Sequence, residues 1–115
     1  MRLPAASLLL LLAACASPPV VTAPARPAFV AGLIAAFEAE PVANPPASIW
    51  RYTYRGETVW YVPARCCDIP STLYDATGEA ICQPDGGYTG RGDGRCPDFI
   101  DTRRDGAVVW SDPRG

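Results

Sequence analysis

The stretch IWRYTYRGETVWYV, residues 49–62, decides the fold of this 115-residue chain. Two runs rich in tryptophan, tyrosine, valine and threonine, residues 49–54 and 58–62, have the composition of β-strands. Between them stands Arg55-Gly56, and the glycine suits the positive φ angles that a two-residue turn requires. The stretch therefore predicts a β-hairpin.

A two-residue turn also fixes which residues of the two strands face each other. We expect a helix to cover the face formed by two facing pairs, Trp50 with Tyr61 and Tyr52 with Val59. The opposite face would be the wetter one, and Arg51 beside Trp60 would form a cation–π pair there.

The helix that this sheet needs is predicted at residues 28–40. Pro27 suits a first helical position, and Pro41 ends the helix because it disfavours α geometry at the residue before it. Apolar residues recur at spacings of three and four, which places them on one side of a helix. They are Phe29, Val30, Leu33, Ile34 and Phe37.

Further strands are predicted at residues 73–75 and 79–82, around a three-residue loop in which Gly78 takes the left-handed position, and at residues 107–110. The fold class is therefore α+β. We expect one N-terminal helix packed on a small antiparallel sheet of three to four strands, stabilised by disulfides, within one domain spanning residues 28–113.

The N-terminus has the order of a secretory signal peptide. Arg2 precedes an apolar run at residues 5–12, and small residues then lead to Cys15. This segment resembles the lipobox of bacterial lipoproteins, which implies removal of residues 1–14, acylation of Cys15 and a membrane anchor with palmitate. The run is shorter than the roughly 20 residues that span a bilayer. Residues 15–27, rich in Pro and Ala, would be a tether, and Ala16 favours the outer membrane in a Gram-negative host.

Composition argues against several classes of function. The chain has twelve acidic residues, a net charge of −2, no lysine and no histidine. Without a basic cluster we expect no nucleic-acid partner. Without histidine the commonest general base is missing, and no serine has a base to activate it. The sequence therefore predicts no catalytic residues, no cofactor and no metal site, which is typical of a protein that is not an enzyme.

Four cysteines follow the tether, and an exported protein is expected to join them in two disulfides. They are Cys66, Cys67, Cys82 and Cys96. Adjacent residues on extended backbone point to opposite sides, so each member of the adjacent pair is expected to bond a distant partner. Cys66–Cys96 with Cys67–Cys82 is favoured slightly over Cys66–Cys82 with Cys67–Cys96. A structural role is favoured over redox chemistry or zinc binding, since no C-x-x-C spacing occurs.

The segment between the last two cysteines, residues 84–95, holds five glycines in twelve residues. It matches no phosphate loop and neither of two common calcium patterns, although oxygens are available at Asp85, Thr89, Asp93, Asp98 and Asp101. We expect a metal-free surface loop pinned by the cysteines at its ends. Long loops in compact domains are often functional, so the candidate binding residues are Tyr88, Arg91 and Asp93.

Several motifs together resemble a family of uncharacterised small bacterial lipoproteins. The matching stretches are IWRYTY at 49–54, CCD at 66–68, LYD at 73–75, CQPDGG at 82–87, and T-G-R-G-D-G-R-C-P-D-F at 89–99. The resemblance implies a self-contained domain without an established activity. We expect a lipid-anchored cell-envelope protein that serves as a binding or structural module, with an envelope protein or ligand as partner. The alternatives are an inhibitor of a hydrolase and a thiol–disulfide redox protein.

Overall fold

The computed structural model describes residues 1, 4, 12–19, 26–66 and 68–115. Residues 12–19 are exposed and form neither helix nor strand, whereas most of the predicted signal segment lies outside the described residues. None of the helices in the described part of the chain is both long enough and apolar enough to cross a membrane. The elements are α1 (Ala28–Glu38), β1 (Ser48–Tyr54), β2 (Glu57–Val62), β3 (Thr72–Tyr74), β4 (Ala80–Cys82), α2 (Phe99–Thr102) and β5 (Arg104–Ser111).

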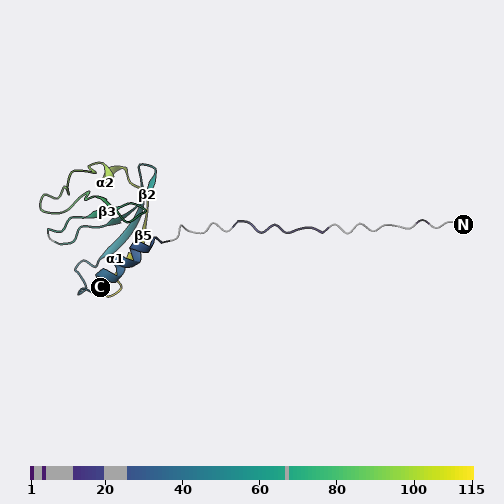
Figure 1. Cartoon of the computed structure of the whole chain (residues 1–115), viewed down its shortest axis with the longest axis horizontal. Coiled ribbons are helices and arrows are strands. Elements are labelled where there is room, and N and C mark those ends of the chain that lie inside the picture. Colours follow the sequence, from purple (N-terminus) through teal and green to yellow (C-terminus); the bar gives the residue numbers. More distant parts are fainter. Residues whose placement is uncertain (2–3, 5–11, 20–25, 67) are drawn as a thin grey trace.

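The described strands form one antiparallel sheet of five, in the order β4-β3-β2-β1-β5 (Figure 1). The α+β class and a disulfide are confirmed, but the sheet is larger than the three to four strands expected. The helix predicted at residues 28–40 is present as α1 and starts at Ala28 as expected, although this position lies inside the chain and not at its N-terminus. A second short helix, α2, which was not expected, precedes β5.

The hairpin between β1 and β2 has the predicted register. Trp50 lies opposite Tyr61, and Tyr52 lies opposite Val59. The turn residues Arg55 and Gly56 have φ angles of 50° and 76°, which is the geometry that matches the right-handed twist of the strands. The predicted hairpin is therefore confirmed.

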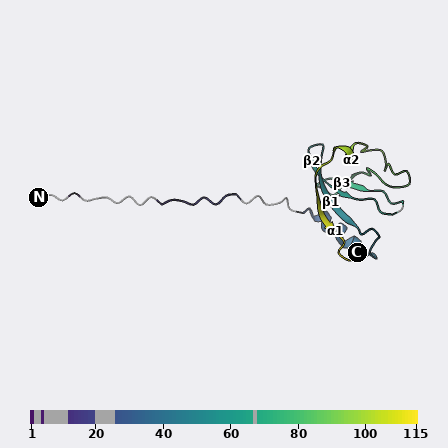
Figure 2. The same ribbon diagram turned by 180° about the vertical axis from the view of Figure 1, so that it is seen from behind.

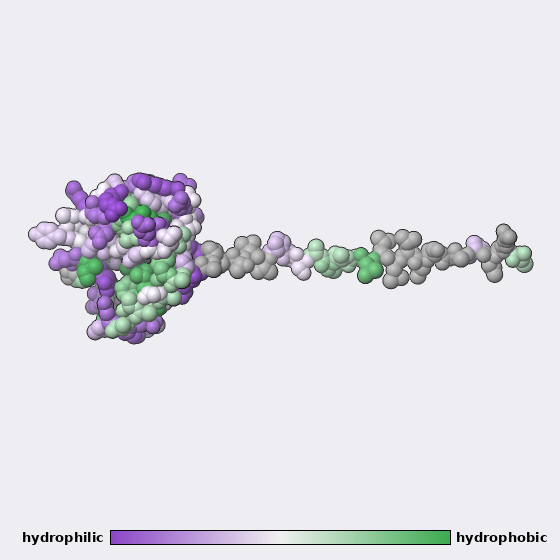
Figure 3. Space-filling view, in the orientation of Figure 1, coloured by the Kyte–Doolittle hydropathy of each residue, from purple (hydrophilic) through white to green (hydrophobic). Residues whose placement is uncertain are grey.

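Helix α1 packs on the opposite face of the hairpin from the one predicted. Val30 lies in one apolar cluster with Ile49, Trp60 and Val62. Trp60 is only 6% exposed and meets the edge of the Phe29 ring at 5.6 Å between centroids. The expectation of a wetter face with an Arg51–Trp60 pair is thus wrong. The outward side of α1 is also apolar, with exposed alanines, and Figure 3 shows this area in green.

The other face of the sheet is covered as well, which explains why the facing pairs were assigned to the wrong layer. Phe99 of α2 is fully buried there, in a cluster with Tyr54, Val59 and Tyr61. Its ring lies 5.3 Å from each of the two tyrosine rings. Figure 2 shows the sheet from behind, with α1 and α2 toward different ends of the domain. Both faces therefore carry aromatic core residues.

A residue near the C-terminus, Arg114, binds the backbone carbonyl groups at the end of α1. Arg114 donates hydrogen bonds to the carbonyl oxygens of Phe37, Glu38 and Glu40, at 3.1, 3.4 and 3.0 Å. Its guanidinium is held by the Asp112 carboxylate at 2.7 Å. A cation at a helix C-terminus interacts favourably with the helix dipole, so Arg114 offsets the acidic side chains at that end of α1.

Candidate functional site

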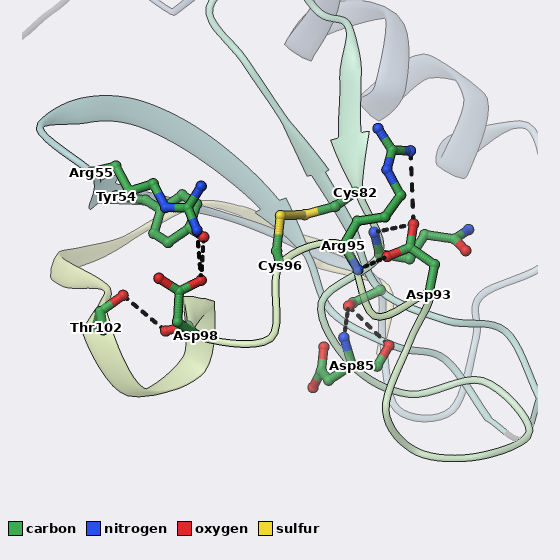
Figure 4. Close-up of a disulfide and its surroundings, with 11 residues drawn as sticks. Tyr54, Arg55, Cys82, Asp85, Asp93, Arg95, Cys96, Asp98 and Thr102 are labelled. Carbon is green, nitrogen blue, oxygen red and sulfur yellow. Dashed lines mark hydrogen bonds and ion pairs between the residues drawn. A yellow bond between two sulfur atoms is a disulfide. The ribbon is translucent and has the colours of Figure 1, made fainter.

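The glycine-rich loop leaves β4 and returns to α2 beside its own starting point. A disulfide joins Cys82 to Cys96, whose Cα atoms lie 6.1 Å apart (Figure 4). Both cysteines are buried, at 2% and 8% exposure, in the cluster that contains Leu73 and Phe99. The loop is thus closed at its base by a covalent bond inside the core.

This bond shows that both predicted connectivities are wrong, because each required Cys82 and Cys96 to have different partners. The prediction placed one member of the adjacent pair in each bond, but the return of the loop brings Cys96 next to the end of β4 instead. Cys66 is itself disulfide-bonded and exposed, and Cys67 lies outside the described residues. Cys15, the predicted lipidation site, is exposed and has a free thiol.

The start of the loop is fixed by Asp85. Its backbone N–H donates to the Ser71 hydroxyl oxygen at 3.0 Å, and its carbonyl accepts from the Ser71 backbone N–H at 3.0 Å. Its carboxylate accepts a hydrogen bond of 2.7 Å from the Tyr61 hydroxyl in β2. Burial, followed by this hydrogen bond to Asp85, raises the pKa of Tyr61, so the tyrosine stays a neutral donor.

The end of the loop is fixed by Asp93. Its carboxylate accepts hydrogen bonds from the backbone N–H groups of Gln83 and Arg95, at 3.1 and 3.0 Å (Figure 4). Its own N–H donates to the Gln83 carbonyl at 2.9 Å. Gly92 has a φ of 61°, and a Cβ there would collide with the Gln83 carbonyl, so a glycine is required. The carboxylate of Asp93, which was predicted as a binding residue, therefore already accepts hydrogen bonds from nearby backbone.

The tip of the loop projects the other two predicted residues into solvent. Tyr88 is 94% exposed, and Arg91 is exposed as well. Within the described chain, neither side chain makes a hydrogen bond or an ion pair. The backbone beneath them is held by hydrogen bonds of 3.1 to 3.3 Å among Gly86, Gly87, Gly90 and Gly92. The loop thus presents an aromatic ring and a cation on a backbone with fixed hydrogen bonds.

A second acidic residue ties α2 to the hairpin turn. The Asp98 carboxylate accepts from the Tyr54 hydroxyl at 2.6 Å and from the Arg55 guanidinium at 3.1 Å (Figure 4). The hydrogen bond from Tyr54 is the main reason that the pKa of Asp98 is lowered. From the sequence, Asp85 was considered as a calcium ligand, and Asp98 as a calcium ligand or a catalytic acid; neither was predicted to accept from a tyrosine. A usable signal was present, because the hydroxyls of buried tyrosines on one face of the sheet need acceptors nearby.

Comparison with known proteins identifies the family of this chain. No curated protein and no solved structure matches the chain. The model of a domain of unknown function, DUF6970, matches residues 35–112, which include the whole sheet and the glycine-rich loop. This match covers well over half of the chain, and the protein therefore belongs to the DUF6970 family.

Proposed function

We propose that this protein is a non-enzymatic binding module of the bacterial cell envelope that contacts a protein partner through Tyr88 and Arg91. The observation that carries the proposal is the 94% exposure of Tyr88 on a loop closed by a core disulfide. Tyrosine and arginine are enriched among residues that dominate binding energy. A loop that is already ordered loses little conformational entropy on binding, which favours its use as a contact surface.

The envelope location rests on the N-terminal sequence. Removal of residues 1–14 and acylation of Cys15 would attach the chain to a membrane, with the outer membrane favoured in a Gram-negative host. The ten residues between Cys15 and Arg26 would then allow a separation of about 36 Å between lipid and domain when fully extended. Such a tether suits a partner that also resides at the membrane surface.

The proposal is tested by quantitative capture from native envelopes with the tagged full chain. Tyr88→Ala combined with Arg91→Ala should reduce the captured partner by at least ten-fold, because each is a candidate for a large share of the binding energy. The matched control combines Ile100→Ala with Arg104→Ala, which removes one exposed apolar side chain and one exposed arginine elsewhere. Equal capture by both double variants would refute a role for the loop tip.

Inhibition of a hydrolase is the second candidate, and the closed base of the loop favours it. A short exposed segment held between Cys82 and Cys96 is suited to occupy an active-site cleft without rearranging. Nanomolar inhibition of an envelope or secreted hydrolase by the purified protein, lost in the Tyr88→Ala and Arg91→Ala variant, would establish it. The Cys82–Cys96 disulfide does not support the thiol–disulfide alternative, because both residues are buried. A free-thiol count on native protein tests this alternative.

A further inference from the structure

A cavity of about 250 Å³ lies on the face of the sheet that carries α1, opposite the face on which the glycine-rich loop packs. It opens between the start of α1, the middle of β1 and the outer strand β5. Two arginines and an indole ring contribute to its wall, together with small aliphatic side chains of β5. The lining residues are Arg26, Pro27, Arg51, Trp60 and 107–109.

The two arginines of this cavity lack a negative partner. Arg51 is half-buried in β1, between Trp60 of β2 and Ala107 of β5. The guanidinium of Arg26 donates to the carbonyl oxygen of Val109 at 3.1 Å. Across the described residues neither arginine forms an ion pair, and no carboxylate lines the cavity. Arg26 is exposed and Arg51 is half-buried, so both cations are open to an anion from solvent, and one anion in the cavity would contact both of them.

The segments of this chain next to the cavity offer no anion either. The first acidic residue in the sequence is Glu38, so the predicted tether contains no carboxylate that could fold back. The first turn of α1, next to Pro27, carries no acidic side chain, and the partial positive charge of its helix dipole adds to that of the arginines. An anion that contacts both arginines would therefore come from outside the chain.

We propose that this cavity binds a phosphate group. Guanidinium groups match the oxygens of phosphate in bidentate geometry, and Arg26 and Arg51 can approach one phosphate from two elements. The ring of Trp60 and the aliphatic side chains of β5 give the cavity apolar walls for the carbon skeleton of a phosphate ester. The phosphate belongs either to an anionic phospholipid or to a soluble ester. The lipid source rests on the proposed anchor, because Arg26 lies at the end of the tether.

The test follows the indole N–H signals by NMR in the full chain, kept in uncharged detergent micelles. The protein has three tryptophans, of which Trp60 lines the cavity and Trp50 lies on the other face of the sheet. Titration with inorganic phosphate should shift the Trp60 signal saturably and leave that of Trp50 in place. Micelles containing phosphatidylglycerol, compared with phosphatidylcholine, test the lipid source in the same way.

Arg51→Gln should weaken the response about ten-fold, since a hydrogen bond to a charged group is worth about 1.5 kcal/mol or more. Arg104→Gln removes the same charge from an exposed site that makes no ion pair within the described chain, and should leave the response unchanged. A Trp60 shift with phosphate but not with phosphatidylglycerol assigns a soluble ester. No shift with either probe, an equal shift with acetate, or an undiminished response in Arg51→Gln would overturn the proposal. None of these outcomes depends on Tyr88 or on acylation, so the proposed function is judged separately.

Discussion

Replacing both Cys82 and Cys96 by alanine tests how strongly the loop is pre-ordered. The disulfide closes a segment with a sequence separation of 14, and a cross-link over a loop of about 15 residues stabilises a fold by about 3 kcal/mol in the chain-entropy model. The two sulfurs also lie buried beside Leu73 and Phe99, so their loss leaves space in the core. The free energy of unfolding should therefore fall by at least about 3 kcal/mol.

The assay is urea unfolding followed by tryptophan fluorescence, with the midpoint and slope fitted for both proteins. Cys15→Ala is the control, because that thiol is free and exposed and its loss should leave the unfolding free energy unchanged. Should the double variant be unfolded in water, proteolysis of the loop in a single Cys96→Ser variant gives a second measure. A double variant within about 1 kcal/mol of the parent would refute the reasoning, since the cross-link is expected to contribute three times as much.

Three further predictions concern the acidic anchors and the lipid. Tyr61→Phe removes the hydrogen bond to Asp85 and should lower the unfolding free energy by about 1–2 kcal/mol in urea titrations. Because the pKa of Tyr61 is raised in the fold, the parent should lose stability as the pH rises above 10, where only the unfolded chain loses that proton, and the variant should lose less. Because the pKa of Asp98 is lowered, its contribution to the free energy of unfolding is present above pH 4 and disappears as the pH falls below that value. In unfolding curves measured from pH 2 to 5, Asp98→Asn should therefore make the free energy of unfolding depend less on pH. Cys15→Ser should abolish incorporation of labelled palmitate in cells, and unchanged labelling would contradict the anchor.

The local parts of the fold could be predicted from the sequence because short-range chemistry decides them. Arg55-Gly56 specified a two-residue turn, and the turn specified the register of Trp50 with Tyr61. Gly78 was assigned the left-handed position of the second hairpin loop, and its φ is 87°. In each case a glycine permits the positive φ that a tight turn requires, and the length of the turn then sets the register of the strands.

The layering could not be predicted, because both faces of the hairpin carry large aromatic residues. Alternation indicates which residues share a face, but it does not indicate which face meets α1 when each has its own cover. The cover of the second face is Phe99 in the short helix α2, which has too few residues to show a helical period. The pairing of Cys82 with Cys96 depends on the position of α2, because the loop must return to the face of the sheet that Phe99 covers before the two sulfurs meet.

For the candidate site, the exposure of Tyr88 and Arg91 could be predicted from the sequence, but the structural role of Asp93 within the loop could not. Tyr88 and Arg91 lie at the tip as expected of a glycine-rich surface segment. Asp93, in contrast, accepts from two backbone N–H groups, and this role depends on how the loop folds back on Gln83. An aspartate in a turn commonly bonds nearby backbone, so residue type favoured that role without identifying the partners.

The central claim, that the loop tip is the contact with a partner, is tested most directly by photocrosslinking in the native host. Tyr88 is replaced by p-benzoylphenylalanine in the full chain, and Ile100, which is exposed on α2, receives the same replacement as a control. After illumination we predict a discrete crosslinked adduct from position 88 and none from position 100. Adducts of equal yield from both positions, or adducts only from position 100, would contradict the claim.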